Sequence, residues 1–303
     1  MVDKKQQGYD RIDQMYQAYL NTHQDMRDRW LLEQTLYTGY SRRQSYSYLQ
    51  LPEQARVLDL GTGYGALALD LAVEHQAEIY AVDSDPDKLT VARTVTEQLR
   101  KSDAGVLQGE LYYQIADINQ LPYDNGYFDV VTARFLFQHL DNPSKAMEEV
   151  FRVLKPGGIA VIFDIDDSLA IIYPPTPGFE TLHLAFTKQQ ESYGGDRLMG
   201  RKLSVLLQHA GFEQVEAHIS IQSYHSLQKK DDFSHQFVVR RFVNSRDTIV
   251  QQGIISAEEY DQALRAFAEA DGNWEFVSSG QVVATGKKSS FSLDLSSMFN
   301  IKR

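Results

Sequence analysis

Short apolar runs alternate with amphipathic segments through the middle of the chain. Five of these runs have strand character: residues 56–60, 78–82, 112–115, 128–133 and 159–164. Apolar positions at helical spacing between them predict helices over about 65–75, 86–102 and 143–154. Because strands that alternate with helices form parallel sheets with right-handed crossovers, the pattern predicts a doubly wound α/β sheet.

The segments that flank this alternation are mainly helical. Tyrosine-rich stripes before Pro52 predict two or three helices. After Asp166 the patterns are helical at about 179–192, 198–210, 232–252 and 256–270, and strand-like at 212–221, 274–279 and 281–286. These segments are long for connections in a compact domain. We therefore expect an N-terminal helical cap at 1–50, a core at 51–165, and a segment 166–303 that completes the sheet and carries lid insertions at about 166–200 and 225–273.

Composition narrows the possible functions. The 303 residues include no cysteine, which excludes disulfides, thiolate metal sites and thiol nucleophiles. The formal net charge of −11 argues against nucleic acid as a partner, because binding to a phosphate backbone relies on lysine and arginine. The chain has neither a secretion signal nor a run of about 18 apolar residues, so we expect a cytoplasmic protein with no membrane span. Since no His, Asp and Glu cluster has metal-ligand spacing, no metal is expected.

A glycine-rich turn joins the first strand of the alternation to the helix that follows it. In the sequence Val-Leu-Asp-Leu-Gly-Thr-Gly-Tyr-Gly-Ala (57–66), Gly61 and Gly63 flank Thr62. Glycines permit positive φ angles here and let a ligand approach the backbone. Asp59 lies two residues before the first glycine, where a carboxylate would repel a pyrophosphate but would suit an ammonium or sulfonium group. The turn therefore favours a cationic ligand.

Two more acidic residues follow the next two strands. Asp83 ends the second strand, at the offset of about 20 residues expected for a carboxylate that binds ribose hydroxyls. Asp117 follows the third strand, where it could accept a hydrogen bond from an adenine amino group while Ile118 covers the ring. Ligands of doubly wound sheets bind beyond the carboxyl ends of the strands, so these acids are expected on one edge. Alternatively, Asp117 is an exposed loop acid and Asp83 caps the next helix, although Ser84 or Asp85 is better placed as a cap.

Five segments carry a resemblance to a known family. They are ValLeuAspLeuGlyThrGlyTyrGly, AlaValAspSerAsp, AlaAspIleAsnGlnLeuProTyr, PheAspValValThrAla and ArgValLeuLysProGlyGlyIleAlaVal, in that order. Together they resemble the class I S-adenosylmethionine (SAM) methyltransferases, particularly the small-molecule branch that includes the ubiquinone/menaquinone enzymes. The similarity covers about residues 50–165 and extends more weakly through 201–212. It implies a Rossmann-like seven-stranded sheet of order 3-2-1-4-5-7-6, with the last strand antiparallel.

The resemblance also implies the chemistry and the site. SAM would be the cofactor, S-adenosylhomocysteine (SAH) the product, and a small molecule the methyl acceptor. Gly61, Gly63 and their neighbours would contact the methionine part of SAM, and Asp59 would help to hold its amino group. Arg134 would line the cofactor and substrate pocket. The residues assigned to the cofactor are Asp59, Gly61, Thr62, Gly63, Asp83, Ser84, Asp117, Ile118 and Arg134.

His139 is the candidate catalytic residue. It lies just after the fourth strand, close to the expected position of the transferred methyl group. A general base accelerates the transfer only if the acceptor must lose a proton. His139 is equally compatible with lining the pocket or capping a helix.

Other residues have a functional and a structural interpretation. Tyrosines of the N-terminal helix could close over SAM or pack as an amphipathic face: Tyr9, Tyr16 and Tyr19. Arg42 or Arg43 could meet the methionine carboxylate, although a surface position is expected. Three lid arginines could meet an acidic group of the substrate or lie on a solvated helix face: Arg240, Arg241 and Arg246. Nothing in the sequence ranks the remaining lid candidates His183, Tyr193 and His225.

Three other interpretations stay open. The first is a nucleic-acid or protein methyltransferase, although Thr132–Phe135 stands where the nucleic-acid enzymes often carry Asn/Asp-Pro-Pro-Tyr/Phe. The second is a NAD-dependent oxidoreductase, because Gly61, Gly63 and Ala66 satisfy the relaxed dinucleotide spacing G-x-G-x-x-A. The third is a SAM-binding protein without catalytic activity. The oligomeric state is also open, and a homodimer is compatible with the sequence.

Overall fold

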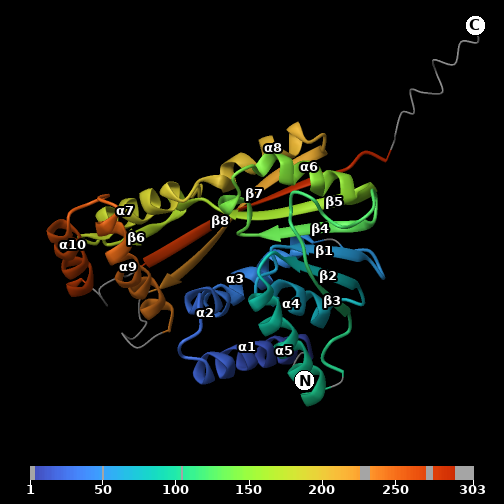
Figure 1. The fold of residues 1–303 in the computed structure, drawn as a ribbon, viewed down its shortest axis with the longest axis horizontal. Coiled ribbons are helices and arrows are strands. Elements are labelled where there is room, and N and C mark those ends of the chain that lie inside the picture. The colour runs from blue at the N-terminus through green and yellow to red at the C-terminus, as the bar shows by residue number, and fades with distance from the viewer. Residues whose placement is uncertain (1–3, 50, 104, 226–232, 271–275, 291–303) are drawn as a thin grey trace, which may run out of the picture.

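The computed structural model describes residues 4–49, 51–103, 105–225, 233–270 and 276–290. In this part of the chain one eight-stranded sheet runs through the molecule, with helices on both faces (Figure 1). Its strands are β1 (Arg56–Leu60), β2 (Glu78–Asp83), β3 (Glu110–Ile115), β4 (Phe128–Arg134), β5 (Leu154–Ile165), β6 (Ile171–Tyr173), β7 (Glu213–His225) and β8 (Phe276–Lys287).

The strand order confirms the predicted topology. Strands β3, β2, β1, β4 and β5 lie side by side in that order and are parallel. Strand β8 follows β5 and is antiparallel to it, and β7 pairs with β8 along its other edge. Strands β8 and β7 thus occupy the positions expected for the seventh and sixth strands. The two β segments predicted near the C-terminus are one strand over their described residues.

Strand β6 is an addition to the expected seven strands. The part of β8 at 281–287 pairs with β5, whereas its first residues, 276–278, extend past the end of β5 and pair with β6. This overhang carries the sheet beyond the core and toward the helices of the lid (Figure 1).

The helices match the predicted pattern closely. They are α1 (Lys4–Thr22), α2 (Arg29–Tyr37), α3 (Gly39–Gln44), α4 (Ala66–Glu74), α5 (Pro86–Ser102), α6 (Pro143–Val153), α7 (Phe179–Ser192), α8 (Leu203–His209), α9 (Phe233–Gln251) and α10 (Ala257–Glu269). Short 3₁₀ turns η1 (Ser45–Tyr48), η2 (Phe137–His139), η3 (Asp167–Leu169) and η4 (Met199–Lys202) connect them. The helix expected at 198–210 is therefore divided into η4 and α8.

Capping residues explain where two of the helices begin. Asp85 caps α5, since its side chain accepts a hydrogen bond from the Asp87 amide at 2.9 Å. This confirms that Asp83, two residues earlier, is not the cap. Ser256 caps α10 through the Glu259 amide at 3.1 Å, as the capping-box pattern predicts.

The buried apolar side chains form three clusters. Helices α1, α4 and α5 pack on one face of the sheet, and α6 and α8 pack on the other. The third cluster lies within the lid, where α7, α9 and α10 bury Phe242 and Phe267 among other side chains. Helices α1–α3 are here called the cap and helices α7, α9 and α10 the lid, and that they cover a bound substrate stays a prediction. Within the described ranges, no helix combines the length and the apolar character needed to cross a membrane.

Candidate functional site

The glycine turn lies between β1 and α4, at the carboxyl edge of the sheet. Gly61 and Gly63 have φ angles of +63° and +56°, which favour glycine. The turn is fastened to β2, because the Thr62 amide donates to the Val82 carbonyl at 2.9 Å and the Gly63 amide donates to Asp83 Oδ2 at 2.8 Å. A Cβ at Gly63 would meet no atom within 4 Å. The top of the turn therefore faces open space that a ligand can enter.

Asp59 lies beneath the turn, not open at its mouth. Its side chain is 1% exposed and accepts a hydrogen bond of 2.6 Å from Thr62 Oγ1. Burial raises the pKa of Asp59 to about 7, and the nearby Asp83 carboxylate acts in the same direction. The observed role of Asp59 is to support the turn. Its direct contact with a ligand stays a prediction.

The other predicted acids gather on the same edge. Asp83 pairs in register with Ile115, which places Asp117 two residues beyond the end of β3. Asp117 is exposed, and only its Oδ1 accepts hydrogen bonds within the described structure, both from Asn119, at 2.8 and 3.0 Å. Its Oδ2 remains available to a ligand. Ile118 is half-buried beside it, and Ser84 is exposed.

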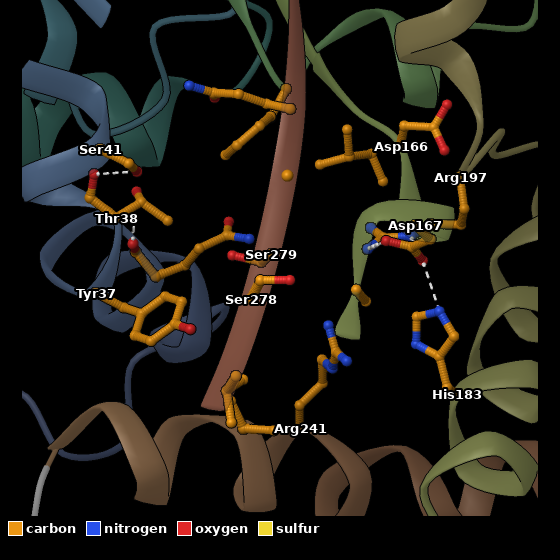
Figure 2. Close-up of a pocket in the computed structure, with 18 of the residues that line it drawn as sticks. Tyr37, Thr38, Ser41, Asp166, Asp167, His183, Arg197, Arg241, Ser278 and Ser279 are labelled. Atoms are coloured by element: carbon orange, nitrogen blue, oxygen red, sulfur yellow. Dashed lines mark hydrogen bonds and ion pairs between the residues drawn. The ribbon is translucent and has the colours of Figure 1, made fainter. Parts of the chain in front are cut away.

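A cavity adjoins this edge at the carboxyl ends of β4 and β5, between the cap and the lid (Figure 2). Its charged and polar lining comes from distant parts of the chain: Gln34, Tyr37, Thr38, Ser41, Arg134, Asp166, Asp167, His183, Arg197, Ser220, Arg241, Ser278, Ser279 and Gln281. Of the residues predicted to bind the cofactor, Arg134 lines this cavity. The glycine turn and the ribose and adenine candidates lie outside it.

Arg134 offers hydrogen-bond donors to the cavity. Its Nη1 donates to Thr38 Oγ1 at 3.2 Å, while its Nε and Nη2 are buried without a partner in the described structure. Burial, together with the charge of Arg42, lowers the pKa of Arg134 to about 9. The next residue, Phe135, has a φ of +57°, which is strained for a residue other than glycine. An anionic ligand would satisfy the two remaining donors.

The acidic side chains of the cavity are already paired. Asp167 accepts two hydrogen bonds of 2.8 Å from Arg197, and Asp166 accepts bonds of 2.6 and 2.7 Å from Arg201. His183 Nε2 lies 3.9 Å from Asp167 Oδ2, and burial lowers the pKa of His183. Asp166, Asp167 and Arg197 were not among the residues predicted for the site. The signal that was available is the pair of acids directly after the fifth strand.

His139 is not brought to this cavity. It ends η2, its side chain is exposed, and it is not among the residues that line the cavity. The predicted catalytic role of His139 therefore gains no support from the geometry and stays a prediction.

The N-terminal candidates pack inside the cap. Tyr16 is fully buried and its hydroxyl donates to the Tyr64 carbonyl at 2.7 Å, while the Tyr9 hydroxyl donates to Glu74 at 2.7 Å. The expected surface position of Arg42 is wrong. Arg42 is 2% exposed, and its Nε donates to the buried Asp70 at 2.8 Å.

The lid candidates separate into different environments. Arg246 binds Asp261 at 2.6 and 2.7 Å, and Arg240 lies 3.5 Å from Glu33. Arg241 lines the cavity. Tyr193 is exposed, and the side chain of His225 lies outside the described residues. In the described ranges no group of three or more His, Asp or Glu side chains is arranged to bind a metal. That the reaction needs no metal stays a prediction.

Comparisons with known proteins agree with this architecture. A sequence profile of the family described as "Methyltransferase domain" matches residues 58–162. The ubiquinone/menaquinone biosynthesis C-methyltransferase UbiE of Geobacter sp. (strain M21) is 30% identical over 171 residues, which cover 54% of this chain and 68% of that protein. The demethylmenaquinone methyltransferase of Thermus thermophilus is 38% identical over 123 residues, or 40% of this chain and 49% of that protein. The match thus spans about half the length of the Thermus relative.

A solved structure shows the same fold. Phosphoethanolamine N-methyltransferase 2 of Haemonchus contortus, in complex with SAH, superposes with a TM-score of 0.51 at 18% identity. The superposition covers 82% of this chain and 52% of that one, and at this identity it shows the fold alone. The Geobacter relative and the family profile support the assignment of the chain to a family. By its sequence, the chain belongs to the class I SAM-dependent methyltransferases, in the branch that resembles the ubiquinone/menaquinone enzymes.

Proposed function

We propose that this methyltransferase binds SAM along the carboxyl edge of β1, β2 and β3 and methylates a small organic acceptor in the adjoining cavity. Two observations carry the proposal. Asp83 holds the Gly63 amide while the space above Gly63 is open, and in the described structure the adjoining cavity contains buried donors of Arg134 without a hydrogen-bond partner. Bound SAM supplies an electrophilic methyl carbon, whose bond to sulfur breaks as its bond to an acceptor oxygen, nitrogen or carbon forms, leaving SAH.

The residues of the edge fit the parts of SAM. The glycine turn admits the methionine part close to the backbone, where the two partnerless donors of Arg134 suit its carboxylate. Asp83 is positioned to accept hydrogen bonds from the ribose hydroxyls. The available Oδ2 of Asp117 suits the adenine amino group, and Ile118 supplies an apolar contact for the ring. These assignments rest on placement at the edge and on available donors and acceptors.

The cap and the lid would orient the acceptor and exclude water. Methyl transfer needs an aligned nucleophile more than it needs acid–base chemistry, so enclosure is the main contribution of these helices. The name of the Geobacter relative, a C-methyltransferase, favours carbon as the methylated atom. The net charge of −11 supports a small molecule over nucleic acid as the acceptor.

We expect Asp83→Asn to weaken SAH binding by about 10- to 100-fold, because a charged acceptor of ribose hydrogen bonds is lost. The asparagine carbonyl can still accept the Gly63 amide, but the hydrogen bond of 2.9 Å that Asp83 Oδ1 accepts from the Asp85 amide is lost. Titration calorimetry with SAH measures the change. Asp85→Asn is the matched control, since it removes a charge two residues away and keeps the cap of α5. The proposal is wrong if the unaltered chain does not bind SAH, or if both variants bind it equally well.

We also expect SAM binding to release a proton near neutral pH. Burial raises the pKa of Asp59 to about 7, so this carboxyl is largely protonated at pH 6.5. A cationic ligand above the turn favours the ionised form, and affinity should therefore fall as the pH falls below 7. Calorimetry at pH 6.5 in two buffers with different ionisation enthalpies counts the protons released.

The matched pair for this experiment is Asp59→Asn and Asp164→Asn. Asp164 is equally buried and burial also raises its pKa to about 7, but it accepts hydrogen bonds from Gln138 and Ile165 at the end of β5. Proton release should disappear in Asp59→Asn and persist in Asp164→Asn. Equal release in the two variants would show that Asp59 does not sense the ligand.

A further inference from the structure

The cavity between the cap and the lid contains more positive than negative charge once its ion pairs are counted. The carboxylate of Asp166 is bound by Arg201 and that of Asp167 is bound by Arg197, with hydrogen bonds between 2.6 and 2.8 Å. His183 adds no full charge, because burial lowers its pKa. Each of the two aspartates is therefore already paired with an arginine, and Asp167 attracts Arg241 only at a distance beyond that of an ion pair.

Arg241 is the cation that remains on the lid side of the cavity. Its side chain rises from α9 into the space between Ser278 and Asp167 (Figure 2). Its Nε is buried without a hydrogen-bond partner, and in the described structure no carboxylate oxygen lies within 4.0 Å of its guanidinium. Burying an unpaired cation is costly, so a ligand that supplies the anion would be favoured.

Packing holds the Arg241 guanidinium in place before any ligand arrives. Its Cζ lies 4.9 Å from the ring centroid of Phe186 and 4.9 Å from that of Phe242. A guanidinium that packs against aromatic rings loses little conformational freedom when it binds a carboxylate through two parallel hydrogen bonds. The other two arginines of α9 do not share this position, because Arg240 lies near Glu33 and Arg246 binds Asp261.

The rest of the cavity wall is largely apolar. Phe135, Ile172, Phe179, Val238 and Val277 line it together with the polar residues described above. Such a wall fits an aromatic or aliphatic body that carries a single acidic group. One guanidinium balances one negative charge, which fits a carboxylate better than a phosphate dianion.

Resting on the proposed function, which leaves Arg134 to the carboxylate of SAM, we infer that the methyl acceptor is a small organic carboxylic acid anchored by Arg241. The carboxylate binds the guanidinium on the lid side, and the apolar body packs against the wall toward β4 and β5. Arg241 is then a specificity-determining residue for the acceptor.

Matched pairs of acids and amides test this inference. Phenylacetate and phenylacetamide, and hexanoate and hexanamide, are titrated by calorimetry into the full chain, with and without saturating SAH. Each acid should bind at least 10-fold more tightly than its amide. Arg241→Gln should weaken the binding of the acids by about 10- to 100-fold and leave the binding of the amides unchanged, because only the acids lose a charged hydrogen-bond pair. The affinity of Arg241→Lys for the acids should lie between the affinities of the unaltered chain and of Arg241→Gln, since lysine keeps the charge but not the paired hydrogen-bond geometry.

Arg240→Gln is the matched control, because it removes a charge from the adjacent position without lining the cavity. The inference is overturned if acids and amides bind the unaltered chain equally, or if the variants at 240 and 241 weaken the acids equally. If Arg241→Gln does not fold, the comparison of acids with amides on the unaltered chain decides alone. Arg241-dependent binding of acids without any binding of SAH would refute the proposed function and leave the anionic site standing.

Discussion

Asp70→Asn is expected to lower the free energy of unfolding by about 3–5 kcal/mol, a large part of the usual stability of a domain. The Asp70 carboxylate is fully buried on α4 and accepts hydrogen bonds from Arg42 at 2.8 Å, from the Tyr46 hydroxyl at 2.7 Å and from Arg43 at 3.2 Å. Asparagine would leave Arg42 as a buried cation without its counter-ion. Urea denaturation followed by circular dichroism measures the loss.

An exposed ion pair provides the comparison for this variant. Asp261→Asn removes a carboxylate that Arg246 binds at 2.6 Å on the lid surface, where each side chain is about one-third exposed. Such pairs contribute about 0–1 kcal/mol. A loss below about 1 kcal/mol for Asp70→Asn, or equal losses for the two variants, would show that the buried network does not hold the cap on the core.

Gly178→Ala is expected to destabilise the lid by about 2–4 kcal/mol while leaving the carboxyl edge of β1, β2 and β3 intact. Gly178 precedes α7 with a φ of +81°, and a Cβ there would lie 2.1 Å from the backbone oxygen of Ala263 in α10. Because the neighbour is backbone, relief requires α7 and α10 to move apart. Hydrogen exchange should become faster in α7, α9 and α10, with SAH affinity unchanged within about twofold.

Gly253→Ala is the control for Gly178→Ala, because it introduces backbone strain in the same lid without a steric conflict. Gly253 also has a positive φ, +68°, but no atom lies within 4 Å of its added Cβ. The cost there is expected to be about 1 kcal/mol, and the exchange of α7 and α10 should hardly change. If the two variants behave alike, the contact between Gly178 and Ala263 does not hold the lid together.

Local signals explain why the core was predictable. The strand, glycine turn and helix around 57–66 and the Asp85–Pro86 start of α5 each lie within a few residues, and the structure places them as expected. Strand β6 carries no such signal, because its three residues become a strand only where β8 extends past β5. Its existence depends on a partner about a hundred residues away.

The cavity was less predictable for the same physical reason. Asp167 and Arg197 are 30 residues apart, and their ion pair depends on how η3 meets the lid. Arg240 and Arg241 are equivalent in sequence, and only the packing of α7 and α10 against α9 decides which one faces the cavity. His139 was inferred from its place after the fourth strand, but it ends η2 outside the cavity lining.

The position of β8 in the sheet has a consequence for biosynthesis. This strand is the last described element of the chain, yet it lies between β5 and β7. During translation, β7 emerges before β8, the strand with which it must pair. Ser278 and Ser279 of the cavity belong to β8 and therefore also emerge after β7. The contacts that fasten the glycine turn involve residues up to Asp83, whereas the cavity is complete only after the C-terminal strand has joined the sheet.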